Sequence, residues 1–200
     1  MGDRFRFEQA IAAIDAANAD DPNTIEFRGE VRPKELAHAE LMTSWVQRLD
    51  PDATEAQRLA ARAHHLRRWV VPRDTYPEGR AGYLRWRRDQ KARHAEEVGE
   101  ILLAAGYDEG TVDRVGQVIR KEGLGDDPQV QVHEDALCLV FLQTQFDPVA
   151  EQLGDDKTVD VVAKTLRKMS ETAWEIALGL DLSDHGRSLV EAAVAEVEAG

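Results

Sequence analysis

Apolar residues recur at intervals of three and four along almost the whole chain, and this periodicity limits the fold more than any other feature. No segment alternates apolar and polar residues for long beside turn-forming residues, so a sheet is not expected. Proline and glycine separate the helical segments. The sequence predicts one all-α domain of seven to nine helices over residues 1–200, with 157–200 forming C-terminal helices that pack on the rest.

The helix boundaries follow from capping signals and breakers. Pro33 stands where proline favours a helix start, Thr54 is a cap residue, and Gly106 suits a helix end. Residues 25–33 form a connector that has room for a short extended piece. Helices are expected over residues 6–19, 33–50, 54–71, 83–106, 108–123, 132–146, 157–178 and 181–198.

Charge is strongly segregated along the chain. The net charge is −13, which argues against nucleic acid as the main partner. Between Arg58 and Arg93, however, ten arginines and one lysine face three acidic residues, giving that segment +8 and the remainder −21. A small anionic ligand fits this pattern better than a large nucleic-acid footprint. The opposed charges also permit self-association into a homo-oligomer.

Composition favours a cytoplasmic protein without a membrane segment. No apolar run approaches the roughly 20 residues that cross a bilayer, and the acidic N-terminal stretch does not resemble a secretory signal. The single cysteine, Cys138, cannot form an intrachain disulfide and fits a reducing compartment. Its apolar surroundings predict a buried side chain.

Histidines form the most suggestive set of candidate ligands. His64 and His65 are adjacent, and together with His38, His94 and Asp135 they fall on four separate expected helices. Imidazole and carboxylate groups suit zinc, manganese, nickel or iron, and the lack of further cysteines argues against a thiolate site. The sequence therefore predicts a metal site built from these five residues. A single divalent ion is expected.

The order of these residues resembles the HD superfamily of metal-dependent helical domains. Members have a histidine, a His-Asp pair, further histidines when two metals bind, and an aspartate on a late helix. The resemblance implies His38, His64 and Asp135 as metal ligands, with His94 available to a second ion. It also implies an HD-like helical fold.

Two positions depart from the HD pattern. His65 stands where the pair has its aspartate, so it either ligates as an imidazole or leaves Glu134 to supply the oxygen. Lys121 and Glu122 occupy the place where two-metal members keep another histidine, which favours one ion. Read as a degenerate site, the same departures favour a non-catalytic helical binding protein.

The chain resembles domain of unknown function family 4202 more closely. The segments that carry this likeness are "HHLRRWVVPRDTYPEGRAGYLRWR", "VIRKEGLGDDPQVQVHEDALCLVFL" and "KTLRKMS". They are spread across most of residues 5–180. The family name implies no activity, so function has to come from the site.

Arginines close to the histidine pair are candidate anion ligands. Arg67 and Arg68 follow His65 within one turn, and Arg73, Arg80 and Arg85 lie on or after a link that contains glycine. The planar guanidinium binds phosphate or carboxylate through two hydrogen bonds. Aromatic side chains that could stack a base or support a guanidinium are interleaved with them: Trp69, Tyr76, Tyr83 and Trp86.

These features favour a metal-dependent hydrolase acting on a small phosphorylated or nucleotide substrate. The ion would activate water and polarise a phosphoryl oxygen. Arg68 would offset developing charge, and Glu134 would act as general base or orient a ligand imidazole. Two other functions stay open at this point: an HD-type iron oxygenase, and the non-catalytic binding protein.

Overall fold

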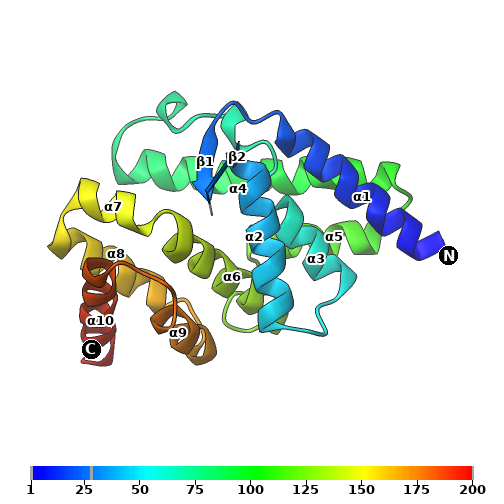
Figure 1. Cartoon of the computed structure of the whole chain (residues 1–200). Helices are drawn as coiled ribbons and strands as arrows, with labels where there is room; N and C mark the ends of the chain where they lie inside the picture. Colours follow the sequence, from blue (N-terminus) through cyan, green and yellow to red (C-terminus); the bar gives the residue numbers. More distant parts are fainter. Residues whose placement is uncertain (1, 28, 200) are drawn as a thin grey trace. The chain divides into compact units, whose positions relative to one another are not determined.

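The structure is a computed structural model that describes residues 2–27 and 29–199 (Figure 1). This described part contains ten α-helices, two short 3-10 helices and one two-stranded sheet. The predicted all-α class is confirmed, and the helix number lies just above the expected seven to nine. Contacts group the chain into two compact units, residues 1–123 and 124–200. The single domain over residues 1–200 stays a prediction.

The first unit is built around α3. Its elements are α1 (Gly2–Ala19), β1 (Thr24–Phe27), β2 (Glu30–Pro33), α2 (Lys34–Leu49), α3 (Glu55–Ala63), η1 (Arg68–Val70), η2 (Arg73–Thr75), α4 (Gly79–Ala104) and α5 (Glu109–Arg120). Helix α3 packs against α1, α2 and α5, while α4 packs along α5 (Figure 1). Fully buried side chains from five helices fill the core, and they include Ile14, Met42, Leu59, Leu102 and Ile119.

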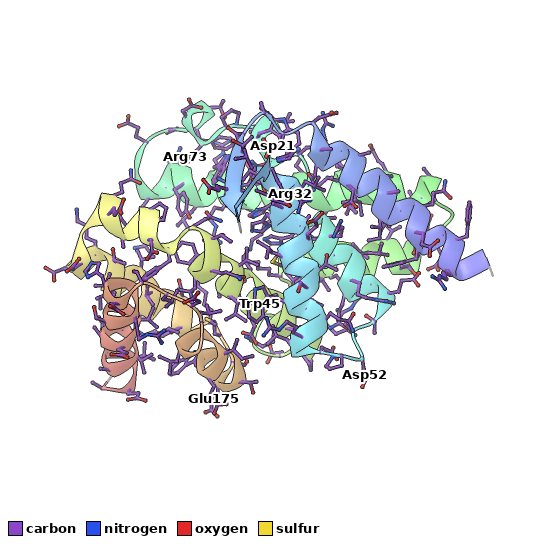
Figure 2. All side chains as sticks on the ribbon, in the orientation of Figure 1. Asp21, Arg32, Trp45, Asp52, Arg73 and Glu175 are labelled. Atoms are coloured by element: carbon purple, nitrogen blue, oxygen red, sulfur yellow. The ribbon has the colours of Figure 1, made fainter. Side chains whose placement is uncertain are left out.

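The connector before α2 forms an antiparallel hairpin that the sequence did not predict. Ile25 pairs with Arg32 and Glu26 with Val31. Each strand has four residues, which is too short for alternation to stand out in the sequence. The Arg32 guanidinium, labelled in Figure 2, donates to both carboxylate oxygens of Glu40 at 2.5 and 2.7 Å. This ion pair ties the hairpin to α2.

Helix α3 ends at Ala63, so the predicted continuation to residue 71 is wrong. Arg67 adopts a left-handed backbone conformation, φ 49°, which an α-helix does not accommodate. Its backbone N–H donates to the Asn18 Oδ1 atom of α1 at 3.0 Å. Because of this break, His64 and His65 lie in a turn beyond the helix.

The second unit is entirely helical in the part that the structure describes. Its helices are α6 (Pro128–Thr144), α7 (Phe146–Leu153), α8 (Asp155–Leu166), α9 (Glu171–Leu178) and α10 (Asp184–Glu198). Helix α10 packs on α8, and α6 contacts α7 and α9. The prediction of one helix over residues 157–178 is wrong, because Ser170 caps a new helix. Core side chains of this unit include Leu139, Leu142, Phe146, Val162 and Leu166.

Two smaller predictions concern apolar segments. Cys138 is buried on α6, as its apolar surroundings predict. Across residues 2–27 and 29–199, no helix combines the length and apolar character needed to span a membrane.

Candidate metal centre

Four histidines of the first unit meet around the turn that follows α3. His38 lies on α2, His64 and His65 on the turn, and His94 in the middle of α4. The His65 ring centroid lies 4.3 Å from that of His38, 4.4 Å from that of His64 and 6.0 Å from that of His94. Three of the four residues are at most 5% exposed, and His65 is partly buried. The four rings therefore form one largely buried cluster.

A buried carboxylate joins this cluster. Glu35 stands one helical turn before His38 on α2, so both side chains share a face. Its Oε2 atom lies 3.1 Å from the His65 Nδ1 atom. The Glu35 backbone N–H donates to Asp21 Oδ2 at 3.0 Å, which anchors this first turn of α2; Figure 2 labels Asp21. The cluster thus contains one potential anionic ligand among the imidazole rings.

The hydrogen bonds of His65 fix its tautomer. The Arg68 Nη1 atom lies 2.8 Å from His65 Nε2. A guanidinium can only donate, so Nε2 accepts and Nδ1 carries the proton. Nδ1 then donates to Glu35. Glu35, His65 and Arg68 consequently form a continuous hydrogen-bonded chain through the imidazole.

His38 is the most exceptional member of the cluster. It is 5% exposed, and both of its ring nitrogens are buried without a hydrogen-bond partner. Burial is the main reason that its pKa falls to about 3, with further lowering by the charges of Arg68, Lys34 and Lys121. His38 is therefore neutral. Buried polar atoms in folded proteins are nearly always satisfied, so two unpaired nitrogens on one ring point to a missing partner.

His94 presents a third buried nitrogen without a partner, its Nε2 atom. A backbone hydrogen bond with His64 holds the ring. Burial, followed by the charges of Arg93 and Arg68, lowers the His94 pKa to about 3. A ring oriented by a backbone hydrogen bond while its other nitrogen stays available is typical of metal-ligating histidines.

The carboxylate environment also favours a cation. Desolvation raises the pKa of Glu35 to about 7, although the nearby charges of Arg68 and Lys34 act in the opposite direction. A carboxylate that is costly to ionise in the fold gains the most from a bound divalent ion. Burial likewise lowers the pKa of the Arg68 guanidinium below its usual range.

The residues present fit a divalent ion. One ligand atom each from Glu35, His38 and His65 lie within 4.8 Å of one another. Tetrahedral ligands about 2.0–2.1 Å from zinc stand roughly 3.4 Å apart, so the farthest pair of ligand atoms would need to approach by up to about 1.4 Å. Two imidazoles and a carboxylate suit zinc, manganese, nickel or iron.

The structure brings together only part of the predicted ligand set. His38 and His65 belong to the three-residue group, and the rings of His64 and His94 lie beside it. Sequence reasoning missed Glu35. The signal was its spacing of three residues from His38 at a helix start, which places a carboxylate and an imidazole on one face.

The predicted acidic residues Glu134 and Asp135 lie on α6 of the second unit and are buried there. The Asp135 carboxylate accepts hydrogen bonds from Gln131 Nε2 at 2.9 Å and from the Ser170 backbone N–H at 2.9 Å and hydroxyl at 2.6 Å. These bonds connect α6 to the start of α9. The ligand role of Asp135 and the base role of Glu134 stay predictions.

Among the five predicted anion-binding arginines, Arg68 contacts the cluster directly. Arg73, labelled in Figure 2, donates to the carbonyls of Tyr76, Pro77 and Gly79 and so holds its own loop. The other three have exposed side chains: Arg67, Arg80 and Arg85. Arg67 pairs with Glu97, and Arg85 pairs with Asp89. Their role in anion binding stays a prediction.

Fold and site together define a mainly helical protein whose first unit buries a cluster of histidines around one carboxylate. Residues 8–190 match the family model of a domain of unknown function, DUF4202, and the chain belongs to this family. Comparisons with curated proteins and with solved structures gave no match. The family description names no activity.

Proposed function

We propose that this protein binds one divalent metal ion through Glu35, His38 and His65 and hydrolyses a small phosphorylated substrate. The observation that carries the proposal is His38, whose two ring nitrogens are buried without partners beside a carboxylate and a second imidazole. Leaving buried polar atoms unpaired costs about 1–3 kcal/mol each. A metal ion that binds the His38 lone pair would offset this cost.

The neutral state of the histidines supports metal binding. A metal-ligating imidazole must have a free lone pair, and burial keeps the pKa values of His38 and His94 near 3. Both rings therefore offer lone pairs at neutral pH. His94, with its Nε2 atom buried and unpaired, is proposed as a fourth ligand.

Arg68 supports an anionic substrate. Its guanidinium is half-buried beside the cluster and has no carboxylate within salt-bridge distance among the described residues. Such a guanidinium is suited to two-pronged binding of a phosphoryl group and to offsetting charge in the transition state. A divalent ion in such a site supplies activated water and polarisation of a phosphoryl oxygen.

We also propose an HD-like fold for this protein. The resemblance to the HD superfamily, carried by the order of residues along the chain, implies Asp135 as a further ligand and Glu134 as general base. Phosphomonoester or nucleotide hydrolysis is the chemistry that this analogy favours. A cytoplasmic location and self-association follow from composition and charge, and they are proposed on that basis alone.

We expect phosphate release from phosphomonoesters or nucleotides by metal-loaded protein, and its loss on substituting His38. The protein would be stripped with chelator, reloaded separately with zinc, manganese, nickel or iron, and assayed against p-nitrophenyl phosphate and a panel of nucleotides. His38→Ala should lower kcat/KM at least ~100-fold, because an ion that activates water is lost. Dioxygen consumption by the iron-loaded sample would separate oxygenase chemistry from hydrolysis.

The matched control is His185→Ala, which removes an exposed histidine paired with Asp155 in the second unit. Its activity should stay within about twofold of the wild type, as for a surface substitution. Phosphate release that survives both chelation and the His38 substitution would refute the proposed function.

A further inference from the structure

Arg68 holds His65 in a state that cannot bind a metal ion. The guanidinium donates to His65 Nε2 at 2.8 Å and thereby uses the lone pair of that nitrogen. The proton sits on Nδ1, which faces Glu35 at 3.1 Å. Neither nitrogen of His65 therefore has a lone pair to offer.

The alternative tautomer does not remove this conflict. Binding an ion through Nδ1 would require the proton to move to Nε2. Nε2–H would then face a guanidinium, which has donors and no acceptor. Two donors would be opposed at a distance of 2.8 Å. Whichever nitrogen of His65 binds the ion, the hydrogen bond from Arg68 has to break.

Hydrogen bonds hold the backbone of Arg68 and the aromatic ring beside it. Only the guanidinium therefore has to move when Arg68 changes its hydrogen-bond partner. The Arg68 carbonyl accepts a hydrogen bond from Gln90 Nε2 at 2.9 Å. The guanidinium carbon lies 4.6 Å from the centre of the Trp86 ring, and Trp86 Nε1 donates to the Val71 carbonyl at 2.9 Å. Backbone and aromatic platform can stay in place while the guanidinium exchanges its hydrogen bond.

We propose that Arg68 couples the binding of the metal ion to the binding of an anionic ligand at the same site. This inference rests on the proposed function. Without an anion, Arg68 donates its hydrogen bond to His65, and its positive charge repels a divalent ion. An anion gives the guanidinium a new partner, frees His65 and offsets the charge, so that the ion and the anion bind cooperatively.

The chemistry of the guanidinium defines the class of anion. A planar fork matches two oxygens of a tetrahedral phosphate or phosphomonoester. Coupling of binding free energies is reciprocal, so the ion must strengthen anion binding by the same factor. The protein would therefore hold its ion weakly when no phosphorylated ligand is present.

The test measures metal affinity with and without inorganic phosphate. Co²⁺ would be titrated into metal-free protein at constant ionic strength and at matched free Co²⁺, with its visible absorption bands reporting ligation. In the wild type, phosphate should tighten Co²⁺ binding by roughly 5- to 150-fold, the usual range of coupling between sites. In Arg68→Met, Co²⁺ should bind more tightly than in the wild type without phosphate, and phosphate should change its affinity by less than about twofold.

Arg87→Met is the matched control. Arg87 also lies over an aromatic ring, 5.7 Å from the centre of Tyr83, and its charge acts on Arg68, but its ring partner is outside the histidine cluster. This variant removes one positive charge and should keep the wild-type response to phosphate. If Arg68→Met does not fold, Arg68→Lys keeps the charge without the fork, and the gain from phosphate should shrink.

The outcomes separate the two claims. Phosphate-dependent Co²⁺ binding in the wild type and in Arg87→Met, lost in Arg68→Met, supports the coupling. Co²⁺ binding that ignores phosphate in the wild type overturns the coupling and leaves the proposed function standing. If Co²⁺ binds to none of the proteins in either condition, the metal site itself is wrong and the coupling falls with it.

Discussion

Replacing Glu35 with glutamine is expected to weaken divalent metal binding by at least ~100-fold while the fold stays intact. Glu35 is the acidic member of the three-residue group and is 5% exposed. Glutamine has nearly the same shape, and its amide oxygen can still accept the His65 Nδ1 proton. The substitution therefore removes the ligand charge and little else. Competition with a chelating dye would measure the affinity.

The same substitution should stabilise the metal-free protein at alkaline pH. The pKa of Glu35 is about 7 in the fold against an ordinary value of 4.5. Because the folded pKa is raised, its contribution to stability is fully present below 4.5 and is lost as pH rises through 7. At pH 8 the ionised carboxylate costs roughly 3 kcal/mol, which Glu35→Gln removes. Urea unfolding of both metal-free proteins at pH 8 would measure the difference.

Glu26→Gln, an exposed position in the hairpin, is the matched control and should change neither quantity. Unaltered metal affinity in Glu35→Gln would contradict the ligand assignment. Asp135→Asn belongs in the same series, because the HD resemblance implies that carboxylate as a ligand. A loss of metal affinity in Asp135→Asn would support the ligand role that the HD resemblance implies for Asp135.

The metal-free protein is also expected to lose stability at acidic pH because of His38 and His94. Their pKa values are about 3 in the fold against an ordinary value of 6.5 for histidine. Because the folded pKa values are lowered, their contribution is present above 6.5 and is lost as pH falls, since the unfolded chain binds protons first. At pH 5 each histidine should cost about 2 kcal/mol.

Several charged groups face these rings and have to be separated from the effect. Arg68, Lys34 and Lys121 lower the pKa of His38, and Arg93 acts on His94. Glu35 titrates in the opposite direction over part of the same range. The difference between wild type and His38→Gln largely cancels the contribution of Glu35, as long as that group titrates alike in both proteins.

The stability of the wild type relative to His38→Gln is therefore expected to fall by about 2 kcal/mol between pH 7.5 and pH 5. Urea unfolding at a series of pH values measures it. His185→Gln serves as the control for losing an exposed histidine, and its curve should follow that of the wild type. Parallel curves for wild type and His38→Gln would mean that His38 accepts a proton in the fold, contrary to a desolvated neutral ring.

The fold could be predicted from the sequence wherever local signals decide it. Helical periodicity predicted most of the helices, and Thr54 with Gln57 forms the capping box that begins α3. The end of α3 could not be predicted in this way. It depends on the left-handed Arg67 and on Asn18, a residue 49 positions earlier in the chain. A contact of that range leaves no trace in a local pattern.

The sequence predicted the residue types of the site better than the contacts between them. The residue order implied His38, His64 and Asp135 as ligands, with His65 or His94 completing the set, and the fold places the four histidines together. Glu35 was not predicted, because the HD resemblance assigns the carboxylate roles to Glu134 and Asp135. The hydrogen bond from Arg68 to His65 follows from the turn after α3, so the competition between guanidinium and metal could not be inferred from sequence.

The metal content of the purified protein is the first quantity to measure, because it reports directly on the proposed site. The wild type and His38→Ala would be purified without a polyhistidine tag and analysed by mass spectrometry, before and after incubation with divalent metal and phosphate. We expect about one zinc, manganese, nickel or iron per chain in the wild type and its loss in the variant. No bound metal in the wild type, even after reconstitution with phosphate present, would contradict it.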